Sequence, residues 1–204
     1  AAPTYDWGAA ANSALLMACR YTGRDEILVP ATISADRYSQ MYNFVRPVAS
    51  IGRVRMDSDT GLMDVADLKA KVSGRTAAVY FENPSFLGLI ETQAHEIVKT
   101  AKKVGALAVV GVDPITLGVI VPPGEYGADI VVGDIQPLGI HMYGGGGLAG
   151  FIASRDEPDI VAEYNAILIS VAPGAKAGEV GFNYSSFERT SYDQRGDSPD
   201  YIGT

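Results

Sequence analysis

The sequence predicts an α/β protein with three layers, in which a parallel or mostly parallel sheet lies between helices. Two observations lead to this class. Short apolar runs alternate along the chain with segments of about ten residues that have helical periodicity, as in successive βαβ units. Some of these runs, such as LAVVGV at 107–112, contain no polar residue, which is typical of parallel strands buried on both faces.

The chain begins with a helix, a strand and a second helix. Small and apolar residues at helical spacing predict a helix over 9–21, which Gly23 is placed to end in the left-handed conformation. The apolar run at 26–30 is predicted to be a buried strand. Ser34 is the expected N-cap of a helix over 35–45. The inward face of this helix is expected to consist of Tyr38, Met41, Tyr42 and Val45.

Five further apolar runs complete the predicted sheet. Asp64 is the expected N-cap of a short helix with Val65 and Leu68 inward. A strongly periodic helix is predicted to begin at Thr92 or Gln93 and to end at Gly105. The strands are predicted at 49–56, 76–81, 107–112, 129–132 and 148–153.

The chain is acidic, with 24 Asp+Glu against 16 Lys+Arg and a formal net charge of −8. A nucleic-acid-binding protein needs a basic surface to displace counterions from phosphates, so nucleic acid is not an expected partner. No apolar run reaches the roughly 20 residues that span a bilayer, and the N-terminus lacks the pattern of a signal peptide. We therefore expect a cytoplasmic protein without a membrane partner, in which the single cysteine, Cys19, is a buried apolar side chain.

Polar residues follow three predicted strands, at the edge of the sheet where parallel α/β proteins bind ligands. Asn83 lies in an Asn-Pro turn that would direct its amide into a cleft, but the turn also suits an ordinary strand-to-helix connection. Asp113 needs a partner, which is either a cationic ring nitrogen of a cofactor or a helix N-terminus. Gln136 and His141 follow the strand at 129–132.

Two segments could hold an anion by their backbone. Trp7, Gly8 and Ala9 precede or open the first helix, where free N–H groups favour an anion, and the Trp7 ring would stack on a ligand or fill a gap. The glycine tract at 144–147 is either an anion-binding nest or a loop that becomes ordered on binding. No metal site is expected, because no Cys or carboxylate spacing joins the only two histidines, His95 and His141.

One known family resembles this chain over nearly its whole length. The alpha-type subunit 1 of glycine-cleavage P-proteins, glycine dehydrogenases (decarboxylating), is similar to residues 189–204 and to the stretches TYDWGAAANSALLMACRYTGR, ENPSFLGLIE, VGVDPITLGVIVPPGEYGADIVVGDIQPLGI and APGAKAGE. The resemblance implies the large domain of the fold-type I aminotransferase-like fold of pyridoxal-phosphate enzymes, over 1–184. It implies that residues 185–204 lead towards a small domain that this chain lacks. The family usually has Asp-Gly-Ala where this chain has Trp7 inserted after Asp6.

The resemblance also implies where the chemistry should lie. The cofactor lysine belongs in the loop after the 129–132 strand, where this chain has Gln136, and glutamine cannot form a Schiff base. We therefore expect no catalytic residue and no covalently bound cofactor here. The expected vestigial or half-site cofactor positions are Trp7, Gly8, Ala9, Asn83, Asp113, Gln136 and His141. The six lysines are expected on helix surfaces (Lys69, Lys71, Lys99, Lys102, Lys103) or in a later loop (Lys176).

The function implied by the resemblance is that of an oxidoreductase component in glycine catabolism, inactive alone. A lysine-bearing beta subunit would carry pyridoxal phosphate, and the pair would decarboxylate glycine and transfer the aminomethyl group to lipoyl H-protein. The alternatives are a non-catalytic scaffold and a domain that binds a small anion without turnover. Whether the chain also forms a homodimer stays open.

Overall fold

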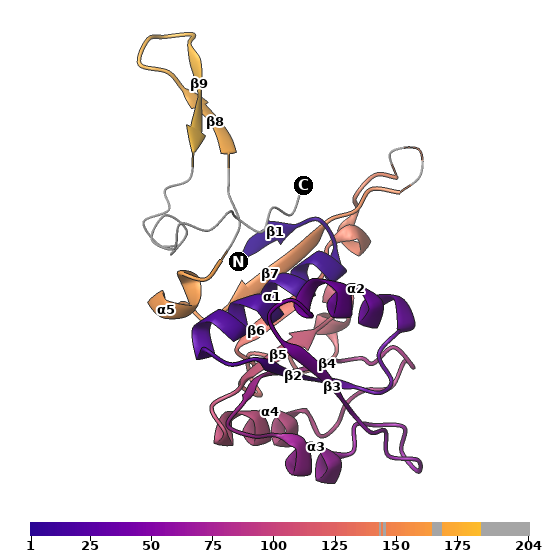
Figure 1. Ribbon diagram of the computed structural model, residues 1–204. Coiled ribbons are helices and arrows are strands. Elements are labelled where there is room, and N and C mark those ends of the chain that lie inside the picture. Colours follow the sequence, from indigo (N-terminus) through magenta and orange to yellow (C-terminus); the bar gives the residue numbers. More distant parts are fainter. Residues whose placement is uncertain (143, 145, 165–168, 185–204) are drawn as a thin grey trace.

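A computed structural model of the chain describes residues 1–142, 144, 146–164 and 169–184. Its main feature is a seven-stranded sheet with helices on both faces (Figure 1). The strands of this sheet are β1 Ala2–Thr4, β2 Glu26–Pro30, β3 Ser50–Val54, β4 Thr76–Glu82, β5 Leu107–Gly111, β6 Ile130–Asp134 and β7 Gly150–Ser154. The helices are α1 Trp7–Thr22, α2 Ala35–Val45, α3 Val65–Lys71, α4 Ala94–Lys103 and α5 Pro158–Val161, with the 3-10 helices η1 Pro114–Gly118 and η2 Gln136–Leu138.

The strands lie in the order β1-β7-β6-β5-β4-β2-β3 across the sheet. β2 pairs in parallel with β3 and β4, and parallel pairing continues through β5 to β6. β7 runs antiparallel to both of its neighbours, β6 and β1. The prediction of an α/β protein with a mostly parallel sheet is confirmed, and the carboxyl ends of β4, β5 and β6 lie at one edge.

Two hydrophobic clusters hold the layers together, one on each face of the sheet. α1 and α2 cover one face, and α3 and α4 cover the other (Figure 1). From Ala78 on, successive residues of β4 alternate between the clusters, so Tyr80 lies in the cluster of α1 and Phe81 in that of α4. Every residue of β4 and β5 is buried, which explains why these strands are nearly continuous apolar runs.

The observed helix ends agree closely with the predicted ones. The position of one side chain differs from its prediction. Gly23 has a φ of 67° and ends α1, and the Ser34 side chain accepts a hydrogen bond from the Arg37 N–H at 3.2 Å. Tyr42 was expected on the inward face of α2, which is wrong, since it is 47% exposed. Only Met41 and Val45 of α2 are buried, because this helix packs along a narrow stripe.

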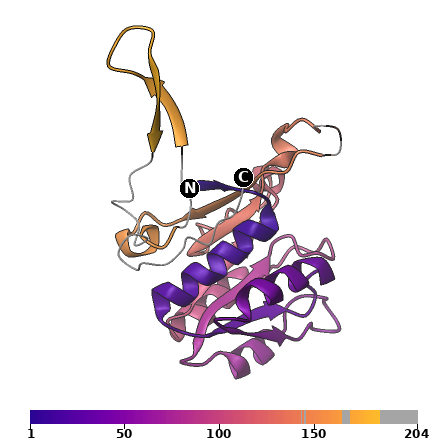
Figure 2. The ribbon, with the colours of Figure 1, turned by 45° about the horizontal axis from the view of Figure 1, so that its top comes forward.

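A separate two-stranded sheet, β8 Ile169–Pro173 and β9 Val180–Tyr184, stands away from the main sheet (Figure 2). The APGAKAGE stretch forms the end of β8 and the turn into β9. Residues 185–204 lie outside the described residues, so the division into 1–184 and 185–204 stays a prediction. Among the helices that the structure describes, none is long and apolar enough to cross a membrane.

Candidate functional site

The start of α1 meets the ends of the parallel strands at one edge of the sheet. The Trp7 N–H donates to Oδ1 of Asp134 at 2.7 Å, which joins the first residue of α1 to the last residue of β6. Gly150 of β7 pairs with Asp134, and a Cβ at Gly150 would collide with the Asp6 carbonyl oxygen. Glycine at position 150 therefore allows the segment before α1 to lie against β7.

Carboxylates of the chain itself occupy the amino terminus of α1. Asp6 is the N-cap, and its Oδ1 accepts a hydrogen bond from the Ala9 N–H at 2.6 Å. Together with Asp134, it engages two of the N–H groups that a bound anion would need. Their negative charge also lies at the positive end of the helix dipole. Gly8 packs against α2, because a Cβ at that position would collide with the Gln40 side chain.

A polar network surrounds the Trp7 indole. Its Nε1–H donates to the Tyr80 hydroxyl at 3.2 Å, and that hydroxyl donates to Oε1 of Glu82 at 2.9 Å. The Nε of Arg37 lies 2.8 Å from the same Glu82 oxygen. The guanidinium carbon of Arg37 lies 4.3 Å from the centroid of the indole, in a cation–π contact. Helices α1 and α2 and strand β4 thus contribute to one network.

Burial controls the protonation of this network. It raises the pKa of Glu82, and the Arg37 cation and the Tyr80 hydroxyl only partly oppose that shift. Burial also raises the pKa of Tyr80 well above its usual value, and the neighbouring Glu82 charge adds to the effect. The Tyr80 hydroxyl therefore keeps its proton at neutral pH and can donate it in a hydrogen bond to Glu82.

Asp134 has a raised pKa as well. Burial is the main cause, and the negative charges of Asp6 and Asp113 add to it. The Trp7 N–H and the Arg37 cation oppose the shift. Among the described residues, several carboxyl groups therefore share this edge with one nearby guanidinium, that of Arg37, which makes the edge unfavourable for a further anion.

Asp113 and Gln136 lie next to this network. Asp113 is the N-cap of η1, and its Oδ1 accepts a hydrogen bond from the Ile115 N–H at 2.9 Å. Of the two partners considered for this carboxylate, the structure thus supplies a helix N-terminus. Gln136 is half-buried and begins η2, which contacts η1.

Asn83 and His141 are not part of the network. Asn83 is 5% exposed, and its Oδ1 accepts a hydrogen bond from the Glu91 N–H at 3.0 Å, which fixes the loop after β4. His141 is exposed in the loop after η2. Residues 143 and 145 lie outside the described residues, so the anion-binding role considered for the tract at 144–147 stays a prediction.

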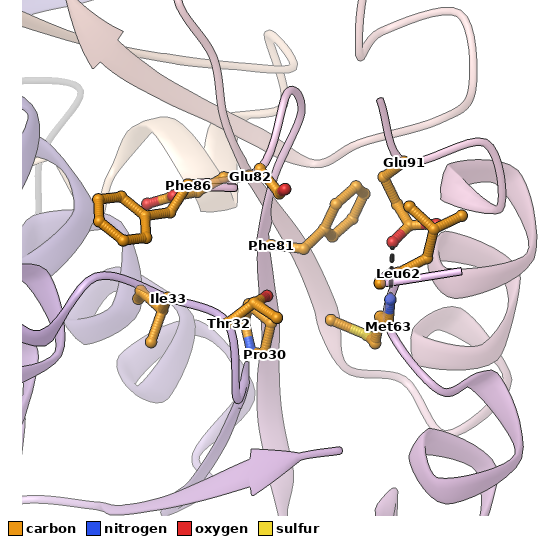
Figure 3. A pocket seen from close by; sticks show the side chains of 11 residues that line it. Pro30, Thr32, Ile33, Leu62, Met63, Phe81, Glu82, Phe86 and Glu91 are labelled. Carbon is orange, nitrogen blue, oxygen red and sulfur yellow. Dashed lines mark hydrogen bonds between the residues drawn. The ribbon is translucent and has the colours of Figure 1, made fainter. Parts of the chain in front are cut away.

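A hollow adjoins the network beside Glu82, between the ends of β2 and β4 (Figure 3). At one side of the hollow, the Glu91 carboxylate accepts a hydrogen bond from the Met63 N–H at 3.0 Å. Its lining is mostly apolar and includes no cation: Pro30, Thr32, Ile33, Gly61, Leu62, Met63, Phe81, Glu82, Ser85, Phe86 and Glu91. Both lining carboxylates already bind groups of the chain, so the hollow offers little to an anionic ligand.

Sequence reasoning missed four residues of the network: Arg37, Tyr80, Glu82 and Asp134. The signal for two of them was present, since Tyr80 and Glu82 are polar residues two positions apart in an apolar run and so share one face. In the described part of the chain, no three His, Cys, Asp or Glu side chains gather as metal ligands would.

The sheet order, the antiparallel β7 and the start of α1 at the carboxyl edge place this chain in the fold-type I α/β class. The inhibitor-bound crystal structure of a glycine decarboxylase (P-protein) of the glycine cleavage system is similar, with a TM-score of 0.78 and 30% identity over 98% of this chain and 44% of that chain. A Campylobacter jejuni structure assigned as an O-acetylhomoserine (thiol)-lyase shares the fold, with a TM-score of 0.58 and 19% identity over 78% of this chain and 36% of that chain.

Sequence relatives identify the family. A family model described as glycine cleavage system P-protein matches residues 1–168. Proteins named "probable glycine dehydrogenase (decarboxylating) subunit 1" are 39% identical over 82% of this chain in Staphylothermus marinus and 37% identical over 83% in Saccharolobus solfataricus. This chain belongs to the glycine cleavage system P-protein family. Its matched part spans only 36% and 38% of the length of these two relatives.

Proposed function

We propose that this chain is an alpha-type component of a glycine decarboxylase, inactive alone, that acts together with a lysine-bearing beta subunit. The pair would decarboxylate glycine and transfer the aminomethyl group to lipoyl H-protein. The names of the relatives support this proposal, because a "subunit 1" implies a second subunit. A cytoplasmic location belongs to the same proposal.

The observation that carries the proposal is the identity of residue 136, two positions after the end of β6. Gln136 begins η2 where the family's cofactor lysine is expected, and an amide cannot form a Schiff base with an aldehyde. The lysines of the chain lie elsewhere. Lys69 and Lys71 are on α3, Lys99, Lys102 and Lys103 are on α4 across the sheet, and Lys176 lies near Glu179 in the turn between β8 and β9.

The residues at the carboxyl edge do not fit pyridoxal phosphate. Asp6 and Asp134 already engage two of the N–H groups that would hold a phosphate, and Gln136 offers no amine. We therefore assign the cofactor to the partner subunit. In this proposal Trp7, Gly8, Ala9, Asn83, Asp113, Gln136 and His141 are vestigial or half-site positions.

Reconstitution of the pair tests this function. The full chain is combined with a lysine-bearing beta subunit of the same family, and glycine–bicarbonate exchange is measured with lipoyl H-protein. Exchange is expected only when both chains are present, and a beta subunit with its cofactor lysine replaced by alanine is the matched control. Equal exchange by the beta subunit alone would favour a scaffold. No exchange, with saturable phosphate binding by this chain alone, would favour the anion-binding alternative.

A further inference from the structure

The geometry points to the Trp7 indole as an internal occupant of the carboxyl edge, whose removal opens a site for a flat heteroaromatic molecule. The inference rests on the proposed function in one respect only: it assigns the position of the Trp7 indole to the ring of a former cofactor. The packing around the indole is described by distances that do not depend on that assignment.

The absence of a side chain at Gly111 leaves room for the Trp7 ring. A Cβ on Gly111, the last residue of β5, would lie 2.7 Å from Trp7 Cζ2, 2.9 Å from Trp7 Nε1 and 2.7 Å from the Tyr80 hydroxyl. Real Cβ contacts are longer, so only glycine lets the indole lie against the strand at this height. Asp113 follows two residues later on the same side of the chain, since the intervening Val112 packs in the cluster of the opposite face.

The contacts of the indole are those that a bound heteroaromatic ring would need. The Tyr80 hydroxyl accepts the ring N–H at 3.2 Å, and the Arg37 guanidinium covers one ring face at 4.3 Å. These partners are held by Glu82, to which both bind, and not by Trp7 alone. The indole is half-buried, so a cavity left by its removal would be open to solvent on one side.

The amino terminus of α1, which could bind a phosphate, is also occupied by groups of the chain itself. The Trp7 main-chain N–H binds Asp134, and the Ala9 N–H binds Asp6. Trp7 therefore has two roles: its indole fills the place of a ring, and its main-chain N–H is already bound at the helix terminus. A phosphorylated ring would have to displace an indole and two carboxylates.

The direct test removes the indole and adds it back. Trp7→Gly is expected to lower the thermal unfolding midpoint, and free indole at ten times its Kd is expected to raise it again by about 4 °C. Wild type and Tyr5→Gly are the controls, because Tyr5 is a nearby ring that is 47% exposed, and neither is expected to respond. A failure of indole to stabilise Trp7→Gly, or an equal effect on Tyr5→Gly, would overturn the inference.

A second variant keeps the test decisive if Trp7→Gly does not fold. Gly111→Ala places a methyl group against the indole in a chain that still contains Trp7, its only tryptophan. The emission of Trp7 is expected to shift to the red as the ring moves towards water, with a lower unfolding midpoint. Unchanged emission and an unchanged midpoint would contradict the packing described above.

Titration with pyridoxine 5′-phosphate separates this inference from the proposed function. This molecule has the ring and the phosphate but no aldehyde, so it does not react with surface lysines. No saturable change in the Trp7 emission of wild type is expected. Saturable quenching would overturn the inference and leave the exchange assay of the reconstituted pair unaffected, whereas a failed exchange assay would leave the indole and emission results standing.

Discussion

The Nε of Arg37 lies 2.8 Å from a carboxylate oxygen of Glu82, and the two side chains are only 19% and 7% exposed. The same guanidinium covers the Trp7 ring. One side chain of α2 therefore neutralises a buried carboxylate of β4 and holds a ring of α1. Removal of either charged partner would leave the other buried without compensation.

Arg37→Met is expected to lower the free energy of unfolding by about 3 kcal/mol, because it leaves the Glu82 carboxylate unpaired. The pKa of Glu82, already raised by burial, should rise further without the cation. The folded state then holds this proton more tightly than the unfolded chain, so stability should fall as pH increases from about 4.5 upward. Urea unfolding at pH 5 and pH 8 measures this difference. Arg37→Met/Glu82→Gln should recover part of the loss, and a pH dependence parallel to that of wild type would contradict the assignment.

Gly133→Ala is expected to destabilise the protein by about 2 kcal/mol. A Cβ at this buried position of β6 would collide with the Val112 carbonyl oxygen and with the Phe151 ring. Gly74→Ala is the matched control, since the space around Gly74 is open, and its stability should be unchanged or slightly higher. Denaturant midpoints of the two variants give the comparison, and equal midpoints would show that β6 shifts to accept the methyl group.

Asp67→Asn is expected to reduce the loss of unfolding free energy that occurs at acidic pH, that is, to flatten the acid limb of the plot of stability against pH. The Lys71 ammonium at 2.7 Å and the Arg55 N–H at 2.8 Å hold the pKa of Asp67 below its usual value. The unfolded chain thus takes up this proton first, so the contribution is present above about pH 4 and is lost as pH falls below it. The free energy of unfolding between pH 2 and pH 6 checks this result. An acid limb identical to that of wild type would contradict this assignment.

Cys19 is expected to react with a thiol reagent only when the protein unfolds. Burial raises its pKa to about 11, and its residue is 9% exposed, so little reactive thiolate is present at pH 8. Labelling with a chromogenic disulfide in native buffer should be at least tenfold slower than labelling in urea. Fast labelling in native buffer would show that α1 opens locally at its carboxyl end.

The fold could be predicted largely because its signals are local. The periodicity of α4 and the apolar run of β5 depend on a few neighbouring residues, and both lie within a residue or two of the predicted ranges. The antiparallel direction of β7 and the three-residue strand β1 were not predicted. The pairing of β1 with β7 joins residues roughly 150 positions apart, which no local pattern reports.

The edge that carries the site could also be predicted, but its inner network could not. The ends of parallel strands meet at one edge by topology, so Asp113 and Gln136 were expected there. The position of Arg37 over Trp7 depends on how α2 packs against α1. In the sequence, Arg37 is only a polar residue in the first turn of a helix. Of the two roles considered for Asn83, the structure shows the local one, in which its amide oxygen accepts a hydrogen bond within its own loop.

Because β7 runs antiparallel to β6, the chain leaves the sheet at the edge opposite the one that carries the site. Residues at the two edges are therefore held by different contacts. After Ser154 the chain is at the edge opposite Trp7, where Arg155 pairs with Asp129 at 2.9 Å and Glu163 pairs with Arg20 at 2.8 Å. These ion pairs anchor the outgoing chain without touching the residues around the indole. Substitutions can therefore accumulate at one edge, and alter its chemistry, while the anchorage at the other edge stays intact.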